Sequence, residues 1–235
     1  MEARHGRDTL AGLRRPLYRG AEAELYLVKW FNDVALAKVR IAKPYRHQRL
    51  DQVLRRRRTV MEARAVRAAL RLGVPAPAIY YVDPIDAVIV MEYVQGSKKL
   101  ADIIDEEGES AAALVEEVGF FAARLHQGKI AHGDLTTSNI LVKDKTLYFI
   151  DFGLADLNAD PRTRAVDLHL FLRSLESTHP QFVDTMYKAF LRGYERAAGR
   201  EETQRLVGLV KEIRLMGRYR EERRTAWSRE ERHVE

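Results

Sequence analysis

The chain has 235 residues, 46% of them hydrophobic, and no cysteine, so it can bury a core but cannot hold it with disulfides or cysteine-ligated zinc. Its formal net charge is +6 and the opening MEARHGRDTLAGLRR lacks the apolar core of a signal peptide. No stretch approaches the roughly 20 apolar residues of a membrane span. We therefore expect a soluble, cytoplasmic protein of one large domain or two lobes, without membrane contact.

Two strands open the predicted fold. Residues Glu24–Trp30 and Val34–Val39, separated by the turn Asn32–Asp33, predict a β-hairpin. Gly20 closes the turn into the first of these strands, in the segment YRGAEAELYL. A residue without a Cβ lets the backbone approach a phosphate, so this turn is a candidate phosphate-binding loop.

A lysine and a glutamate in the next elements are candidates for the same site. Strand alternation places Lys38 on the face that carries Val34 and Leu36, under a nucleotide rather than in free solvent. The stretch Leu50–Leu72 is free of glycine and proline, which predicts one long helix, and Glu62 lies within it. A helix carboxylate that pairs with a strand lysine gives that lysine a fixed orientation toward phosphates.

The predicted long helix stops at Gly73 and is strongly basic. Against Asp51 and Glu62, this part of the chain holds nine arginines: Arg46, Arg49, Arg55, Arg56, Arg57, Arg58, Arg64, Arg67 and Arg71. A second basic stretch runs from Lys211 to Arg224. A solvated helix face is the more frequent explanation of a charge run, but four consecutive arginines exceed what solubility requires, which favours contact with nucleic-acid phosphates. The candidate RNA-binding residues are Arg55, Arg56, Arg57, Arg58, Arg218 and Arg220.

Two further strands, around Ala78–Val82 and Ala87–Tyr93, complete the N-terminal part. Gly96 breaks the chain after them, so we place a hinge at Met91–Gly96. The predicted division is an N-lobe of residues 1–95 and a C-lobe of residues 96–235 that ends in a basic tail. The two lobes together form one domain.

Helical patterns dominate the rest of the chain. Apolar residues recur at helical spacing over Ala111–Gln127. Ile140–Val142 and Leu147–Ile150 predict a short hairpin, whose ends bring the residues that flank it close together. From residue 162 onward the pattern is helical, with breaks near Pro180 and Gly199.

The most informative stretch is AHGDLTTSNILVKDKTLYFIDFG, residues 131–153, which contains Asp134, Asn139 and Asp151. Phosphoryl transfer needs magnesium held on the phosphates and a nucleophile aimed in line, and carboxylates with one amide provide both. Each residue alone has an ordinary explanation, such as a turn cap or a chance tripeptide. Their order after a turn glycine, a strand lysine and a helix glutamate makes phosphoryl transfer the better hypothesis.

These residues resemble one family, the small kinase/ATPase subunit of the KEOPS (EKC) complex, which supports threonylcarbamoyladenosine (t6A) modification of tRNA. The resemblance covers nearly the whole chain and rests on RGAEAELY around Gly20, AKVRIAKPYRHQRLD from Ala37 to Asp51, EAR at Glu62, GVPAP from Gly73 to Pro77, VMEYVQG from Val90 to Gly96, HGDLTTSNIL and IDFGLA. It implies an archaeal source and an α+β, bilobal protein-kinase-like fold. The N-lobe would be small and β-rich with one long helix, and the C-lobe helical, reduced and without an extended activation segment.

The resemblance also implies roles for individual residues. Asp134 would be the catalytic aspartate, Lys38 would bind phosphate with Glu62 as its partner, and Asn139 and Asp151 would be magnesium ligands. The residues expected to bind ATP are Gly20, Ala21, Glu22, Lys38, Met91, Glu92, Tyr93 and Val94, with backbone groups of Glu92 to Val94 meeting adenine. The implied activity is that of an atypical, Mg-ATP-dependent serine/threonine kinase and ATPase. Its implied partners are the threonylcarbamoyl-transferase subunit, a small regulatory subunit and tRNA.

Departures from ordinary protein kinases narrow this activity. Gly133 and Thr136 stand where the common HRDLKPEN loop has arginine and lysine, and no APE motif follows the DFG tripeptide. The helix-like RAVDLHLFL begins within about a dozen residues of that tripeptide. These absences favour ATP hydrolysis or autophosphorylation coupled to a partner over broad phosphorylation of proteins.

Two alternatives stay open. A small-molecule phosphotransferase of the aminoglycoside or choline kinase type also uses HGD with asparagine at plus five, although Phe152 and Gly153 and the short chain argue against it. A non-catalytic adaptor would bind tRNA through its arginines and keep ATP only as a structural ligand. The full set of candidate site residues makes such a catalytically inactive site the less favoured hypothesis.

Overall fold

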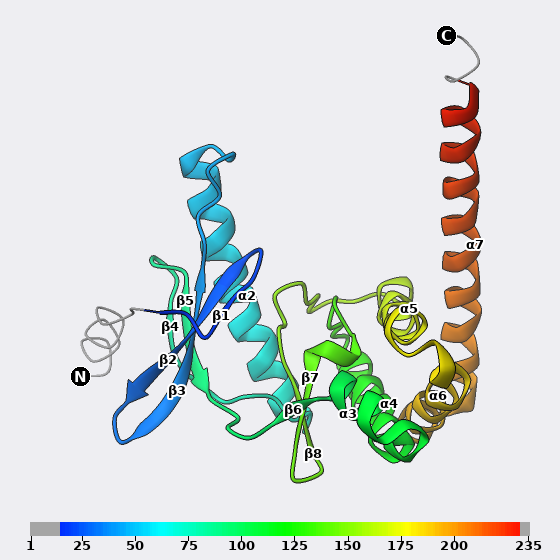
Figure 1. Ribbon diagram of the computed structural model, residues 1–235, viewed down its shortest axis with the longest axis horizontal. Helices are drawn as coiled ribbons and strands as arrows, with labels where there is room; N and C mark the ends of the chain where they lie inside the picture. Colours follow the sequence, from blue (N-terminus) through cyan, green and yellow to red (C-terminus); the bar gives the residue numbers. More distant parts are fainter. Residues whose placement is uncertain (1–14, 231–235) are drawn as a thin grey trace.

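The computed structural model describes residues 15–230, and the side chains of residues 15–216. The expected lack of a signal peptide falls largely on residues 1–14, outside this range. The N-lobe is a five-stranded antiparallel sheet in the order β1-β2-β3-β5-β4, with the long helix α2 beside it (Figure 1). Its elements are β1 (Tyr18–Arg19), β2 (Ala23–Trp30), β3 (Asp33–Arg40), α2 (Gln48–Arg71), β4 (Ile79–Asp83) and β5 (Val88–Glu92).

The hairpin of β2 and β3 is confirmed, but its turn lies one residue earlier than predicted. Trp30 pairs with Asp33, so the two loop residues are Phe31 and Asn32 rather than Asn32 and Asp33. Phe31 consequently has a φ of 53°. Burial of alternate residues on one face of the sheet sets this register and overrides the usual preference of asparagine and aspartate for turns.

Helix α2 starts two residues before the predicted Leu50 and ends at Arg71. Gly73 then adopts a φ of 73°, the left-handed conformation that commonly ends a helix. The last turns of α2 carry Ala65, Val66 and Ala69 into the same hydrophobic cluster as the helices of the C-lobe. The helix therefore connects the β-sheet to the second lobe.

The C-lobe combines a three-stranded sheet, in the order β6-β7-β8, with five helices among the described residues. Its elements are β6 (Lys98–Lys99), α3 (Leu100–Glu107), α4 (Ala112–Gln127), β7 (Ile140–Lys143), β8 (Thr146–Phe149), α5 (Pro161–Thr178), α6 (Val183–Ala198) and α7 (Arg200–Glu230), with 3-10 turns at Gly108–Ala111, Thr137–Asn139 and Pro180–Phe182. The β7–β8 hairpin and the breaks near Pro180 and Gly199 are confirmed. β6 and α3 were not predicted.

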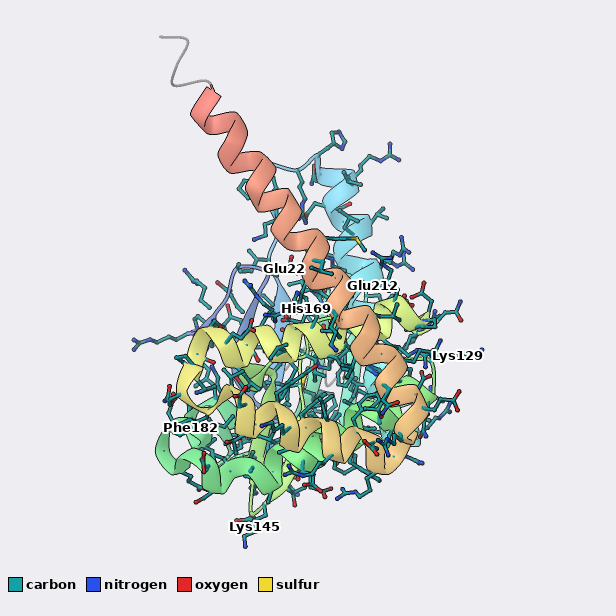
Figure 2. The ribbon with its side chains drawn as sticks, turned by 90° about the vertical axis from the view of Figure 1, so that its right-hand side faces the viewer. Glu22, Lys129, Lys145, His169, Phe182 and Glu212 are labelled. Atoms are coloured by element: carbon teal, nitrogen blue, oxygen red, sulfur yellow. The ribbon has the colours of Figure 1, made fainter. Side chains whose placement is uncertain are left out.

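Helix α7 packs on the body at its start and then extends away from it (Figure 1). Figure 2 shows α7 crossing α5 near His169 and Glu212. Arg214 of α7 and Glu176 of α5 form an ion pair of 2.8 Å at this crossing. Within residues 15–230, none of the helices combines the length and apolar character needed to cross a bilayer.

Helices α4 and α6 touch through their backbones at two glycines. A Cβ added to Gly119 would lie 1.9 Å from the carbonyl oxygen of Phe190, and one added to Gly193 would lie 1.7 Å from that of Glu116. Neither position tolerates a side chain without separation of the helices. Because α4 leads directly to residues 131–134, this contact positions the segment that carries Asp134.

Candidate active site

The side chain of Lys38 joins the two lobes. Its Nζ lies 2.6 Å from Oε1 of Glu62 on α2 and 2.8 Å from Oδ1 of Asp151, which is 113 positions away in the chain. Burial opposes the charge of Lys38, but the carboxylates of Glu62 and Asp151 outweigh burial and raise its pKa. Lys38 is therefore a fixed, buried cation at the junction of β3, α2 and the segment after β8.

Asp151 follows β8 in a constrained backbone conformation. Its φ is 62°, in the left-handed region that residues with a Cβ seldom adopt. Burial opposes the charge of this carboxyl as well, but Lys38 outweighs it and lowers the pKa. Half of the side chain is exposed, so one side of an ionised carboxylate faces solvent.

Asp134 and Asn139 are joined by hydrogen bonds across five positions of the chain. The Nδ2 group of Asn139 donates to the backbone oxygen of Asp134 at 2.9 Å and to its Oδ2 at 2.8 Å. The backbone oxygen of Asn139 accepts a bond of 3.0 Å from the N–H of Ile150, next to Asp151. The β7–β8 hairpin therefore brings Asn139 and Asp151 to adjacent strand ends, as predicted.

The donor chemistry of this cluster fits magnesium bound together with phosphate. The Asn139 amide nitrogen is used by Asp134, which leaves the amide oxygen as a ligand, and Asp151 supplies a carboxylate. Within the described part of the chain, no three His, Cys, Asp or Glu side chains gather into a metal site. Magnesium prefers oxygen ligands and binds through one or two protein groups plus substrate phosphates, so two protein oxygens are sufficient here.

A buried aspartate that sequence reasoning missed holds the backbone before Asp134. Oδ2 of Asp167, on α5, accepts the N–H of His132 at 2.6 Å, and its Oδ1 accepts the N–H of Gly133 at 2.8 Å. His126 reaches Oδ2 of the same carboxylate through Nε2 at 3.1 Å. A buried carboxylate that accepts several N–H groups defines the position of all of them. The signal in the sequence was an aspartate inside the apolar pattern RAVDLHLFL.

His132 connects the Asp134 loop to the segment around Asp151. Its Nε2 faces the carbonyl oxygen of Ile150 at 3.1 Å and therefore carries the proton, while Nδ1 accepts the N–H of Asp134 at 3.3 Å. Its ring also packs on Phe152, with centroids 4.6 Å apart. Complete burial lowers the pKa of His132, against the opposing effect of Asp167, Asp151 and Asp134, which keeps the ring neutral.

Gly133 stands at the contact between this loop and the segment after DFG. Its φ is 81°, and a Cβ there would lie 2.1 Å from the carbonyl oxygen of Leu154. That segment is short, since α5 begins at Pro161. It is also held down, because Ala131 and Asp156 exchange two backbone hydrogen bonds. No extended activation segment lies here.

The predicted phosphate-binding turn connects β1 to β2. The N–H of Gly20 donates to the carbonyl oxygen of Ala23 at 2.9 Å, and the turn also contains Ala21 and Glu22. Glu22 accepts a hydrogen bond of 2.5 Å from Arg58. That bond, with the charges of Arg58 and Arg40, outweighs burial and lowers the pKa of Glu22. Glu22 is therefore an ionised carboxylate between two cations.

The hinge residues Glu92 to Val94 take part in several backbone hydrogen bonds. The N–H of Glu92 donates to Ala78 at 2.8 Å, and the carbonyls of Tyr93 and Val94 accept from Gln95 and Ser97. Within residues 15–230, the N–H of Val94 has no recorded acceptor. The N–H of Val94 is therefore a candidate donor to a ligand.

An apolar face beside Lys38 was not singled out from the sequence. The ladder places Leu27, Leu36 and Met91 next to one another on β2, β3 and β5, on the side of the sheet that carries Lys38. Leu27 is 45% exposed and the other two are half-buried. An exposed apolar surface next to a buried cation fits a planar base joined to phosphates.

The candidate RNA-binding arginines fall into three groups. Arg55 pairs with Asp51 and Arg58 with Glu22, so these two have intramolecular partners. Arg56 and Arg57 are exposed, and among the described residues no ion pair is recorded for them. Arg218 and Arg220 lie on α7, and their side chains fall outside the described residues.

A second buried cation lies beside Lys38. Arg40, two residues further along β3, is 5% exposed and pairs with Oε2 of Glu62. Side chains two positions apart in a strand share a face, and this period is the signal that would have identified it.

Comparison with known proteins identifies the family. A sequence model of the lipopolysaccharide kinase (Kdo/WaaP) family matches residues 13–194. The KEOPS complex subunit Bud32 of Pyrococcus abyssi is 38% identical over 83% of this chain and 91% of that protein. A probable serine/threonine-protein kinase BUD32 homolog of Archaeoglobus fulgidus is 36% identical over 79% of this chain and 88% of that protein.

A longer relative contains the same segment. A probable bifunctional tRNA threonylcarbamoyladenosine biosynthesis protein of Methanothermobacter thermautotrophicus is 38% identical over 80% of this chain, which spans 35% of that protein's length.

Solved structures agree on the fold. The protein WaaP, in complex with acyl carrier protein, has a TM-score of 0.63 at 19% identity and covers 92% of this chain and 91% of its own. The Rio2 kinase of Chaetomium thermophilum has a TM-score of 0.60 at 16% identity and covers 91% of this chain and 75% of its own. The fold is therefore bilobal and protein-kinase-like. The chain belongs to the family that the Kdo/WaaP model describes and, by its similarity over most of both chains, to the Bud32 family of kinases.

Proposed function

We propose that this kinase-family protein binds Mg-ATP at the site around Lys38 and uses it as an ATPase and serine/threonine-type kinase that serves t6A modification of tRNA. The observation that carries the proposal is the meeting of Lys38, Glu62 and Asp151 within 2.8 Å, from three distant segments. A lysine held between two carboxylates is poised to bind phosphate once magnesium takes over Asp151.

Each remaining residue has a role that follows from its contacts. Asp134, held by the Asn139 amide at 2.8 Å, is the candidate base that orients the attacking hydroxyl or water and accepts its proton. Asn139 and Asp151 would hold magnesium, which when bound neutralises charge that develops on the phosphates. Val94 would donate to adenine, and Leu27, Leu36 and Met91 would cover its face.

Hydrolysis or autophosphorylation fits this site better than transfer to many proteins. The segment between Gly153 and Pro161 is short, and hydrogen bonds tie it to the chain before Asp134. It offers no surface of its own for an extended peptide. We therefore expect a bound partner to regulate the rate of ATP turnover.

The partners are inferred from the relatives. In the bifunctional t6A biosynthesis protein, the part similar to this chain makes up 35% of the length. The rest of that protein is therefore covalently linked to its kinase-like part. We propose the threonylcarbamoyl-transferase subunit as the corresponding separate partner of this chain. A small regulatory subunit and tRNA would complete the assembly.

Mg-ATP turnover of the purified chain tests the proposal, measured alone and with the transferase subunit and tRNA. We expect Asp134→Ala and Asp151→Ala each to lower turnover by about 10²- to 10⁴-fold. Asp184→Ala, which removes an exposed carboxylate from α6, is the matched control and should leave turnover unchanged. Full turnover in the first two variants would refute the assignment. Rapid phosphorylation of one small hydroxylated compound would favour a small-molecule phosphotransferase instead.

A further inference from the structure

Arg40 has more partners than a strand residue needs for stability alone. Its Nη2 contacts Oε2 of Glu62, and its Nη1 lies 3.8 Å from Oε2 of Glu22 in the phosphate-binding turn. Only 5% of its side chain is exposed. One guanidinium therefore touches α2 and the turn while its backbone belongs to β3.

The two carboxylate oxygens of Glu62 are divided between two cations. Oε1 meets Lys38 at 2.6 Å, while Oε2 meets Arg40. Glu62 is 2% exposed, and a buried carboxylate that loses its only cation is strongly destabilising. When nucleotide binds, Lys38 keeps its bond to Oε1 of Glu62 while it contacts phosphates, so Arg40 on Oε2 fixes the carboxylate that orients Lys38.

The phosphate-binding turn is fastened to the same region. Besides the contact of Glu22 with Arg40, the N–H of Ile41 donates to the Glu22 carbonyl at 3.1 Å, and Nζ of Lys43 contacts the carbonyl of Ala21. Ordinary glycine-rich loops need three glycines for close backbone approach to phosphates. Here Gly20 alone is present, and the end of β3 holds the turn.

Arg40 also borders the segment that carries Asp151. A Cβ added to Gly153 would lie 3.1 Å from Nη2 of Arg40 and 3.0 Å from Oδ1 of Asp151. The glycine of the DFG tripeptide therefore leaves room for the pair of Arg40 and Glu62. The turn, α2 and this segment all converge on one side chain.

We propose that Arg40 is a positioning residue that holds Glu22 in place and also Glu62, the carboxylate that orients Lys38 toward the nucleotide. It would keep α2 permanently docked, a task that activation-segment phosphorylation performs in regulated protein kinases. The segment between Gly153 and Pro161 is short, so the ion pairs of Arg40 would act together with the apolar packing of Ala65, Val66 and Ala69 on the C-lobe. The inference rests on the proposed nucleotide site and deepens it.

The test measures binding rather than turnover, by titration calorimetry with Mg-ADP and with a non-hydrolysable ATP analogue plus magnesium. Residues that orient a ligand-binding group commonly change affinity by about 10- to 100-fold when replaced, so Arg40→Met should raise the Kd at least tenfold. Arg40→Lys keeps the charge without the fork and should recover part of the affinity. Hydrogen exchange should become faster in α2 around Glu62 for Arg40→Met.

A double-mutant cycle separates positioning from general stability. If Arg40 acts on the turn through Glu22, then Glu22→Gln should raise the Kd in the wild-type background and add little in the Arg40→Met background. Arg214→Met is the matched control, because it breaks a partly buried pair with Glu176 at 2.8 Å between α5 and α7. That variant should lose stability without a change in Kd.

A wild-type Kd for Arg40→Met, or effects of Arg40 and Glu22 that simply multiply, would overturn the inference. If Arg40→Met does not fold, the test uses Arg40→Lys and Glu22→Gln, since Glu22 is half-exposed. A wild-type Kd in both of these variants would then overturn the inference. Failure of the wild-type chain to bind either nucleotide would overturn the proposed function and this inference with it. If the wild-type chain binds nucleotide and the Arg40 and Glu22 variants bind it with the same Kd, the inference is overturned but the proposed function is not.

Discussion

A single methyl group added at Gly133 tests how closely the Asp134 loop is packed on the segment after DFG. In Gly133→Ala the new Cβ would start 2.1 Å from the carbonyl oxygen of Leu154 and 2.6 Å from its carbonyl carbon. Non-bonded carbon atoms prefer about 3.5 to 4.0 Å, so the two segments must separate by more than about 1 Å. Asp134, the next residue, moves with them.

The magnitude has two parts that a second variant separates. A φ of 81° costs an alanine about 1 kcal/mol relative to glycine, and forced overpacking costs about 1 to 3 kcal/mol more. Gly73→Ala is the matched control, because Gly73 has a φ of 73° but nothing within 4 Å of its added Cβ. We therefore expect a loss in the free energy of unfolding of about 1 kcal/mol for Gly73→Ala and about 2 to 4 kcal/mol for Gly133→Ala.

Urea unfolding and Mg-ATP turnover measure the two consequences. A displacement of about 1 Å in a catalytic group can cost about 10²-fold in rate, so Gly133→Ala should lose turnover while Gly73→Ala retains it. Equal destabilisation of the two variants, with full turnover in both, would refute the steric argument. The same argument explains why arginine, which ordinary protein kinases have at this place, does not fit here.

Three further outcomes are expected. Burial lowers the pKa of His132, whereas a histidine in the unfolded chain titrates near 6.5. Below about pH 6.5 the unfolded state therefore binds one more proton than the folded state. The free energy of unfolding should fall by about 1.4 kcal/mol for each pH unit below 6.5. Urea titrations at pH 7.0 and 5.5 measure this loss, and His132→Asn should reduce it; an identical pH dependence in both proteins would contradict the assignment. Asp167→Asn, which replaces an acceptor of several N–H groups with an amide, should cost about 3 kcal/mol in urea unfolding and lower turnover, whereas wild-type stability would show that the carboxylate is dispensable. Reversing the charges of Arg56 and Arg57 together should weaken tRNA binding and reduce the slope of log affinity against log salt by about two, and unchanged binding would assign both to a solvated helix face.

Local patterns in the sequence predicted most of the scaffold. Helix α2 with Gly73 after its end, the β7–β8 hairpin and the helix α4 were all predicted to within a few residues, because each depends on periodicity or on a helix-ending glycine. The turn before β3 was predicted one residue too late. Asparagine and aspartate favour turns, but the buried face of the hairpin determines which residues pair.

The candidate residues that carry motifs were named from the sequence, whereas the residues that support them were not. Lys38, Asp134 and Asp151 lie in recognisable segments, whereas Asp167 contacts Gly133 from 34 positions away. Nothing local distinguishes such an aspartate from one on a solvated helix face. Arg40 could have been found, because it shares a strand face with Lys38, but only the fold shows that one glutamate serves both.

The backbone contact between α4 and α6 has a consequence for how freely this protein can change. Where side chains separate two helices, each substitution alters their spacing, and the loops at their ends shift with it. At Gly119 and Gly193 the spacing is set by peptide groups, which every sequence shares. Core side chains around this crossing can therefore diversify over evolutionary time while the loop that follows α4 keeps its place, and a library built for redesign should leave these two glycines untouched.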